Sequence, residues 1–301
     1  MTDQTSLLKD RVRKILPDIN IQSIEVHQEG LVNDVVIVNN TWVVRFTKTE
    51  FAQELMDMEY HLLNLLEPAL SLPIPKPEKL APDILIYPHL SGGDFTREIW
   101  AGVSQYQQQA LADQLGRFLD ELHGVSTARL DWEVPHTLAP VSRETWADIH
   151  ERLLVKVEPL LLPHQVNWMQ DLFEVPLNSP EFFDFEPVLI HGDLAPYHIL
   201  YSHEKQSLNG VIDFGTAGLG DPATDLGSLI SSYGESLVSR IAATYPGFQA
   251  LLPRARFYAQ AIELQWVLLG VESGEEYWFT AHLGGARDIG WVRMPEGRTR
   301  F

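Results

Sequence analysis

The chain has 301 residues, of which 45% are hydrophobic and 21% charged, a balance typical of a globular protein with one large domain or two lobes. It contains no cysteine, which excludes a disulfide framework, a thiolate nucleophile and a zinc–thiolate site. The 22 Lys and Arg against 41 Asp and Glu give a net charge of −19, which disfavours a nucleic-acid partner and favours a cationic small molecule, although an acidic surface also serves solubility alone.

The N-terminal residues lack the apolar core of a signal peptide, and no apolar run in the chain approaches the length of a membrane span. We therefore expect a soluble, cytoplasmic and monomeric protein without a membrane partner.

The first third of the chain predicts mostly strands. An amphipathic helix over 7–16 ends near Pro17, where proline stops helical hydrogen bonding. The segments "NDVVIV" and "TWVVRF" flank Asn39 and Asn40, and this pattern predicts a hairpin because asparagine tolerates left-handed backbone conformations.

A second helix is predicted from Glu50 to Leu66, where apolar residues recur at helical spacing. The proline-rich segment "SLPIPKPEKLAP" cannot be helical, and it leads to a short strand, "DILIYPHL", and a glycine-bearing join, "SGGD". Helical periodicity dominates from about residue 104 onward. We therefore predict a sheet-rich lobe over 1–90 and a helical lobe over 91–301, with a ligand-binding cleft between them.

The segment "LIHGDLAPYHILYS" concentrates polar residues between two apolar stretches. It is interpreted as a strand, a loop and a second strand, followed by a turn over 203–209 and an antiparallel return through "GVIDFG". Such a hairpin places Asp213 near His198, with Asp193 in the preceding loop. Three groups able to meet a hydroxyl and a divalent metal would then converge.

"HGDLAPYH", followed by "DFG" and then by "GDPATDLGSL", resembles the catalytic and metal-binding loops of the aminoglycoside and macrolide phosphotransferases. This resemblance implies an α+β, two-lobed protein-kinase-like fold with an N-terminal antiparallel sheet and a larger helical lobe. It also implies transfer of the γ-phosphoryl group of ATP or GTP, with Mg²⁺, to a hydroxyl of a cationic, aminoglycoside-like acceptor.

By match to these motifs, Asp193 would be the catalytic base and Asp213 a magnesium ligand, since phosphoryl transfer mainly needs positioning and charge neutralisation. His191 would brace the loop and Asp225 would buttress it, although a helix-capping role also fits Asp225. His198 stands where protein kinases carry an asparagine metal ligand, and histidine there resembles the aminoglycoside 2″- and macrolide phosphotransferases. A histidine merely filling the strand, or a zinc site with His191 and His203, are the weaker alternatives.

The nucleotide site should lie in the first lobe. The resemblance assigns Gly30 and Asn33 to the loop over the phosphates, Val43 to the base and Arg45 to the phosphates. Arg45 replaces the usual lysine, and arginine can still grip phosphate oxygens. The expected partner of Arg45 is Glu59. Lys48 is the alternative cation to Arg45, and Glu54 is the alternative carboxylate to Glu59.

The strand "ILIYPHL" resembles the hinge that offers backbone groups to the base, through His89 and Leu90. Tyr87 matches the gatekeeper position, and its bulk resembles relatives that favour guanine nucleotides. We therefore expect GTP to be at least as good a donor as ATP, whereas a core tyrosine without donor selectivity remains the alternative.

The last third of the chain combines carboxylates with aromatic residues, a composition that suits a polyamine sugar. The residues predicted to bind the acceptor are Glu235, Trp266, Glu272, Glu275 and Glu276. Three alternatives stay open: a macrolide phosphotransferase, a metabolite kinase acting on choline, an amino sugar or a hydroxy-amino acid, and a pseudokinase that binds nucleotide without turnover.

Overall fold

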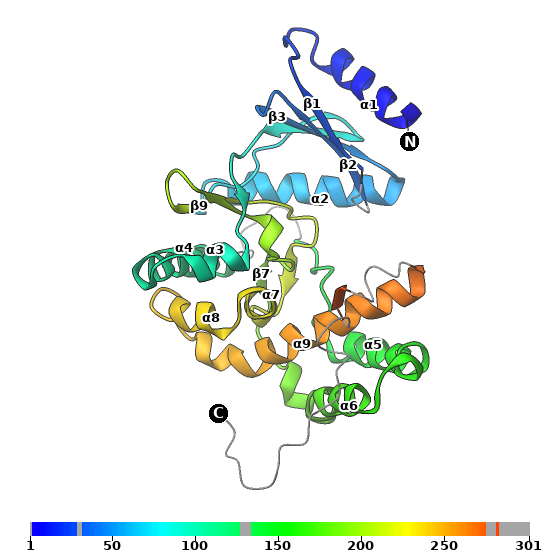
Figure 1. The fold of residues 1–301 in the computed structure, drawn as a ribbon, viewed down its shortest axis with the longest axis vertical. Coiled ribbons are helices and arrows are strands. Elements are labelled where there is room, and N and C mark those ends of the chain that lie inside the picture. The colour runs from blue at the N-terminus through cyan, green and yellow to red at the C-terminus, as the bar shows by residue number, and fades with distance from the viewer. Residues whose placement is uncertain (1, 29–31, 127–133, 275–280, 283–301) are drawn as a thin grey trace.

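The structure is a computed structural model, and it describes residues 2–28, 32–126, 134–274 and 281–282. A sheet-bearing part formed by the first third of the chain stands above a helical part formed by the rest (Figure 1). This arrangement confirms the predicted α+β fold with an N-terminal antiparallel sheet and a larger helical portion.

The N-terminal sheet is antiparallel throughout, and Asn39 and Asn40 connect its second and third strands. Both asparagines have φ = 52°, the left-handed conformation of a tight hairpin, so the predicted turn is confirmed. The strand order is β1-β2-β3-β5-β4, with bounds Ile24–His27 for β1, Asn33–Val38 for β2, Trp42–Thr47 for β3, Glu78–Ala81 for β4 and Ile84–Pro88 for β5.

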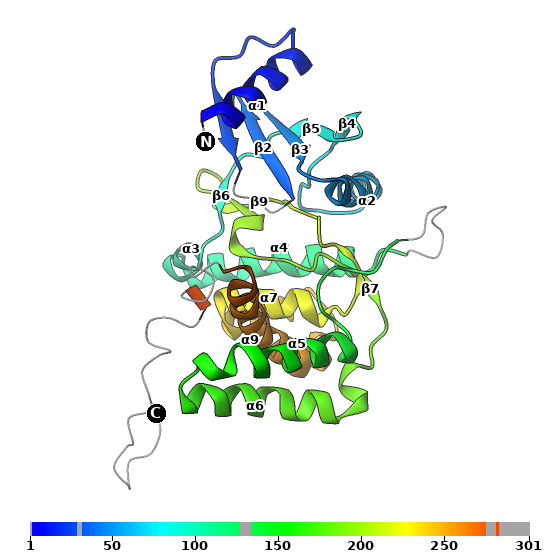
Figure 2. The same cartoon turned by 90° about the vertical axis from the view of Figure 1, so that its right-hand side faces the viewer.

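The two faces of this sheet pack against different helices. Helix α1 (Thr2–Ile15) covers one face through Leu8 and Val12, which share a buried cluster with Val44 and Phe46 of β3. Helix α2 (Glu50–Leu66) has the predicted bounds, and it lies between the sheet and the helical part in both views (Figures 1 and 2). Alternate residues of β3 therefore point toward α1 and toward α2.

The helical part is built around the pair α7 and α9. A Cβ placed on Gly227 would lie 2.8 Å from the Cβ of Tyr258, so the two helices need glycine at their closest approach. Among the described residues, no helix has the length and hydrophobicity to cross a lipid bilayer. The helices are α3 (Arg97–Gly102), α4 (Gln105–His123), α5 (Arg143–Lys156), α6 (Pro163–Asn178), α7 (Ala223–Tyr233), α8 (Glu235–Ile241) and α9 (Phe248–Ser273).

Two small sheets carry the loops of the predicted site. Strand β7 pairs with β10, while β8 pairs with both β9 and β6, so the "SGGD" join supplies a short strand to the second sheet. The bounds are Gly93–Asp94 for β6, Val188–Ile190 for β7, Ile199–Ser202 for β8, Ser207–Val211 for β9 and Gly218–Gly220 for β10.

The turn between β8 and β9 is shorter than predicted. Gln206 has φ = 51°, which closes the turn within 203–206, and the return strand begins at Ser207 rather than after residue 209. The hairpin still pairs Ile199 with Val211, as the predicted convergence requires.

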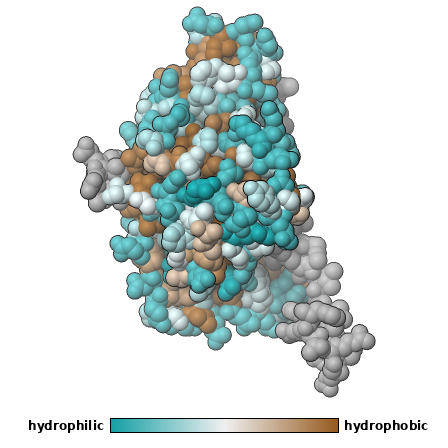
Figure 3. Space-filling model, turned by 90° about the vertical axis from the view of Figure 1, so that its left-hand side faces the viewer, coloured by the Kyte–Doolittle hydropathy of each residue, from teal (hydrophilic) through white to brown (hydrophobic). Residues whose placement is uncertain are grey.

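The surface has the hydrophilic covering expected of a globular protein. On the face drawn in Figure 3, hydrophilic side chains cover most of the molecule, and hydrophobic ones appear between them.

Candidate functional site

His198 lies between the two carboxylates predicted to act with it. Its Nδ1 is 2.8 Å from the backbone oxygen of Asp193, and its Nε2 is 3.3 Å from Oδ2 of Asp213. The Asp193 carboxylate is also close, with Oδ2 3.6 Å from His198 Nδ1. A carbonyl oxygen only accepts, so Nδ1 carries a hydrogen and Nε2 is the nitrogen aimed at Asp213.

The backbone holds this arrangement. The short helix η4 (Pro196–His198) delivers His198 to the start of β8, and the Ile212 N–H donates to the His198 carbonyl oxygen at 2.9 Å. Asp213 follows with φ = 64°, a strained conformation for a residue other than glycine. The hairpin thus turns the Asp213 carboxylate back toward His198.

The charges at the site shift three pKa values. Burial raises the pKa of Asp193, and this effect outweighs the opposing charges of His198 and His191. Burial alone would lower the pKa of His198, but hydrogen bonding to Asp213 and its negative charge raise it. The pKa of Asp213 falls well below its usual range, because the His198 hydrogen bond and the Arg45 charge overcome the effect of burial.

The donor set of His198 and Asp213 fits a magnesium ion. Two adjacent ligands of an octahedral ion at about 2.1 Å are about 3 Å apart, close to the 3.3 Å between His198 Nε2 and Asp213 Oδ2. Within the described ranges, no group of three or more His, Asp or Glu residues forms a larger metal cluster. Mg²⁺ is usually held by one or two side chains together with phosphate and water oxygens.

The His191 ring is buried and engaged at both nitrogens. Its Nε2 lies 3.1 Å from the Ile212 oxygen and its Nδ1 accepts the Asp193 N–H at 3.2 Å. These partners define a neutral ring with the hydrogen on Nε2, and burial lowers its pKa accordingly. Because both nitrogens are engaged, a zinc site using His191 would have to break hydrogen bonds of the predicted catalytic loop, residues 191–198.

Asp225 holds the catalytic loop from the helical core. Its two oxygens accept the N–H groups of His191 at 2.9 Å and Gly192 at 2.8 Å, and it is fully buried. Burial would raise its pKa, but the hydrogen bond from His123 and the neighbouring histidine charges lower it. Asp225 is therefore a structural anchor of the loop as well as a residue in the first turn of α7.

His123 and Tyr245, which were not predicted from the sequence, complete this anchor. His123 Nε2 is 3.1 Å from the carboxylate of Asp225, and His123 Nδ1 is 2.6 Å from the hydroxyl of Tyr245. The available signal was a histidine next to Leu122 and four residues after Leu119, on the buried face of α4.

Arg45 and Glu59, which were predicted to pair beside the nucleotide, form an ion pair. Arg45 Nη1 donates to Glu59 Oε1 at 2.7 Å, with side chains only 8% and 1% exposed. The rival carboxylate Glu54 is exposed on α2, and the rival cation Lys48 bonds the Gln28 oxygen at 2.7 Å. Burial alone would lower the pKa of Arg45, but the charges of Glu59, Tyr87 and Asp213 outweigh that effect, so the pKa is raised overall.

Of the other residues assigned to the nucleotide, some lie within the described part of the chain and one does not. Asn33 begins β2 and is buried, whereas Gly30 lies outside the described residues. Tyr87 lies opposite the buried Val43 across β3 and β5, and burial raises its pKa to about 12.

The two residues predicted to form the hinge, His89 and Leu90, follow β5 and are half-buried. The His89 N–H donates to the Thr41 oxygen at 2.8 Å, so this N–H is already engaged within the chain. Leu90 lies against β9, its Cδ1 3.2 Å from where a Cβ on Gly210 would stand.

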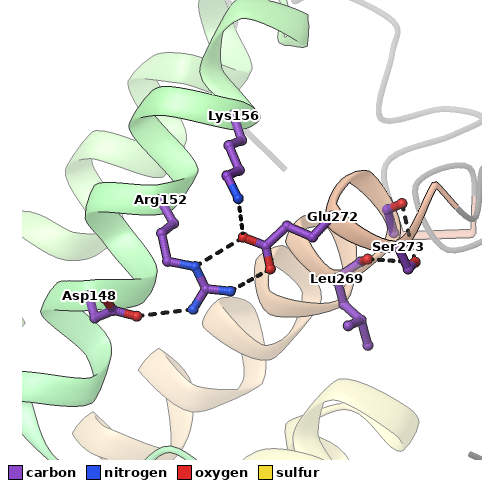
Figure 4. A network of polar contacts seen from close by, with 7 residues as sticks. Asp148, Arg152, Lys156, Leu269, Glu272 and Ser273 are labelled. Atoms are coloured by element: carbon purple, nitrogen blue, oxygen red, sulfur yellow. Dashed lines mark hydrogen bonds and ion pairs between the residues drawn. The ribbon is translucent and has the colours of Figure 1, made fainter.

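The carboxylates predicted to bind the acceptor have partners within the chain. Glu235 forms a two-pronged ion pair with Arg256 at 2.6 and 2.9 Å. Glu272 of α9 receives Arg152 and Lys156 of α5, with Asp148 completing the network (Figure 4).

The residues predicted to bind the acceptor also include Trp266, Glu275 and Glu276. The Trp266 ring stacks on that of His282, with centroids 6.1 Å apart. Glu275 and Glu276 lie outside the described residues.

Glu272→Gln is expected to lower the free energy of unfolding by about 1 kcal/mol at pH 7, the usual scale for a partly exposed network. Hydrogen bonds from Arg152 and Lys156 lower the pKa of Glu272 to about 2. The difference from wild type should hold above the ordinary carboxyl value of about 4.3 and shrink as the pH falls toward 2. Urea unfolding between pH 7 and pH 3 measures it.

The matched control for this change is Glu174→Gln, which alters an exposed glutamate on α6. If the Glu272→Gln protein is as stable as this control at pH 7 but binds the acceptor much more weakly, Glu272 binds the acceptor and is not a structural residue.

A family sequence model and a relative of known activity both match most of this chain. The sequence model of the "Phosphotransferase enzyme family" matches residues 23–258. Viomycin phosphotransferase of Streptomyces vinaceus is 24% identical over 247 residues, which cover 78% of this chain and 82% of that protein.

Solved structures with the same fold cover nearly the whole chain. The GDP and kanamycin complex of APH(2″)-IIIa superposes with a TM-score of 0.78 at 25% identity, covering 92% of this chain and 95% of that one. The macrolide 2′-phosphotransferase MphH of Brachybacterium faecium superposes with a TM-score of 0.66 at 22% identity, covering 94% and 99%. The latter similarity concerns the fold alone.

Proposed function

The chain belongs to the phosphotransferase enzyme family, and we propose that it transfers the γ-phosphoryl group of ATP or GTP to a hydroxyl of an aminoglycoside-like antibiotic. The observation that carries this proposal is the convergence of Asp193 and Asp213 on His198, which lies 3.6 Å from the carboxylate of Asp193 and 3.3 Å from that of Asp213. A loose phosphoryl-transfer transition state needs positioning and charge neutralisation, and these three residues can supply both.

Asp193 acts on the acceptor. Its carboxylate accepts a hydrogen bond from the acceptor hydroxyl, orients that oxygen toward the γ-phosphorus and takes the proton as the new bond forms. The raised pKa of Asp193 makes it a better proton acceptor than an ordinary aspartate. His191 and Asp225 hold the loop in place, so the carboxylate does not have to be ordered on binding.

The nucleotide is held from both lobes. Asp213 and His198 would hold Mg²⁺ through Oδ2 and Nε2, and the bound ion would neutralise charge on the phosphate oxygens. Arg45, fixed by Glu59, presents its remaining guanidinium N–H groups to the phosphates. The half-buried Tyr87 lies opposite Val43, at the position where relatives that favour guanine nucleotides carry a large aromatic residue, and this resemblance supports GTP as at least as good a donor as ATP.

The acceptor class is supported by two similarities and by the charge. Viomycin phosphotransferase is a relative, APH(2″)-IIIa is solved with kanamycin, and the net charge of −19 favours cationic molecules. A macrolide is the second candidate. It is favoured because Glu235 is paired with Arg256 and Glu272 with Arg152, which leaves less unpaired negative charge to bind a polycation.

Purified protein with MgGTP or MgATP is expected to consume nucleotide only in the presence of its acceptor. The panel is kanamycin, gentamicin, viomycin, a macrolide and choline, with phosphorylated product identified by mass spectrometry. We expect an aminoglycoside to be phosphorylated, with kcat/KM for GTP at least equal to that for ATP. Turnover of choline alone would make the protein a metabolite kinase, and better turnover with ATP would refute the nucleotide preference.

A further inference from the structure

Tyr197 is an exposed aromatic residue in the catalytic loop. Its side chain is 52% exposed, although Leu194, His198 and Ile199 around it are buried. The turn that presents it is fixed, because the Phe95 N–H donates to the carbonyl oxygens on either side, those of Pro196 at 3.2 Å and Ile199 at 2.8 Å. A large ring is therefore held toward solvent by a rigid backbone.

The ring stands beside the reacting groups. Its centroid is 4.4 Å from that of His198, with the two planes at 81°, and the negative charges of Asp193 and Asp213 act on its hydroxyl. Across the described part of the chain, the Tyr197 hydroxyl forms no hydrogen bond. Both the ring and the hydroxyl are available to a ligand.

The Tyr197 ring lies next to the group that would receive the acceptor. The nucleotide phosphates are assigned to Arg45 and, through Mg²⁺, to His198 and Asp213, whereas the acceptor hydroxyl must approach Asp193, which is four residues from Tyr197 and acts on its hydroxyl. An electron-rich ring attracts cations, and nearby carboxylates strengthen that preference. Glu235 and Glu272, which the sequence suggested for this task, are already paired with arginine.

We propose that Tyr197 is a specificity-determining residue for the acceptor: its ring receives a positively charged, amine-bearing ring of the acceptor and so places the neighbouring hydroxyl at Asp193. This inference rests on the proposed phosphotransfer and adds to it the residue that selects a cationic acceptor. A phenol face contributes more to binding an ammonium group than an aliphatic side chain of similar bulk does.

The test replaces the ring while keeping apolar bulk. Tyr197→Leu is expected to raise the KM for kanamycin about tenfold, with the KM for MgGTP within about twofold of wild type. Tyr197→Phe, which keeps the ring, should stay within about threefold of wild type. Tyr106→Leu, at a tyrosine on α4 that is 85% exposed, is the matched control and should change neither constant.

The outcomes separate this proposal from the proposed function. An unchanged kanamycin KM in Tyr197→Leu, or an equal rise in both KM values, would overturn the role of Tyr197 while leaving phosphotransfer intact. If the wild type turns over no acceptor, the proposed function fails, and calorimetric titration of kanamycin into the MgGDP-bound protein decides instead. Weaker kanamycin binding by Tyr197→Leu than by wild type supports the proposal, and equal or absent binding overturns it.

Discussion

Asp193→Asn is expected to lower kcat about a thousandfold, with the KM for nucleotide nearly unchanged. The amide cannot take the proton of the acceptor hydroxyl, and positioned general bases contribute roughly 10² to 10⁴ in rate. The surrounding loop should persist, because its anchors are the backbone N–H groups of His191 and Gly192 on Asp225. Initial rates with the best acceptor, at saturating nucleotide, measure the effect.

The control for this change is Asp184→Asn, which removes one negative charge from an exposed position before β7. It should retain full activity, so that a loss in Asp193→Asn cannot be ascribed to net charge. If Asp193→Asn kept a third or more of wild-type kcat, another group would be the base and the proposed role of Asp193 would be refuted.

Glu59→Ala is expected to lower the free energy of unfolding by about 3 kcal/mol or more and to raise the nucleotide KM. The change leaves the Arg45 charge buried without its partner, and breaking a buried pair costs about 3–5 kcal/mol. Urea unfolding gives the stability, and initial rates at varied MgGTP give the KM. Glu54→Ala, on the exposed face of the same helix, should change neither value appreciably.

A double replacement separates the structural and functional roles of this pair. Arg45→Met combined with Glu59→Leu removes both charges and should recover most of the lost stability, since apolar residues can replace a buried ion pair. Nucleotide affinity should stay low because no cation remains for the phosphates. A Glu59→Ala protein as stable as Glu54→Ala would show that the pair is not buried in solution.

Local signals accounted for the parts of the fold that the sequence predicted well. The bounds of α2 were correct because Thr49 caps its first turn, accepting the Ala52 N–H at 3.1 Å, and its apolar spacing is regular. The turn at Asn39 was correct because two asparagines are suited to its backbone. His198 and Asp213 were placed together because a single hairpin joins them.

Contacts between distant segments could not be predicted from the sequence. Glu272 meets Arg152 across 120 residues and His123 meets Asp225 across 102, and nothing in the local pattern identifies either partner. The error at 203–209 has a different cause. Gln206 takes a left-handed conformation that glutamine rarely adopts, so the tight turn carried no recognisable residue.

The anchoring of the catalytic loop by Asp225 also bears on the entropy of ligand binding. The two amides it holds can open only if the buried carboxylate in the first turn of α7 is pulled away, so the loop belongs to the same cooperative unit as the core around that helix. Substrates therefore meet a loop that was ordered when the chain folded. The conformational entropy of that loop was lost during folding, and it does not weaken the binding of nucleotide or acceptor.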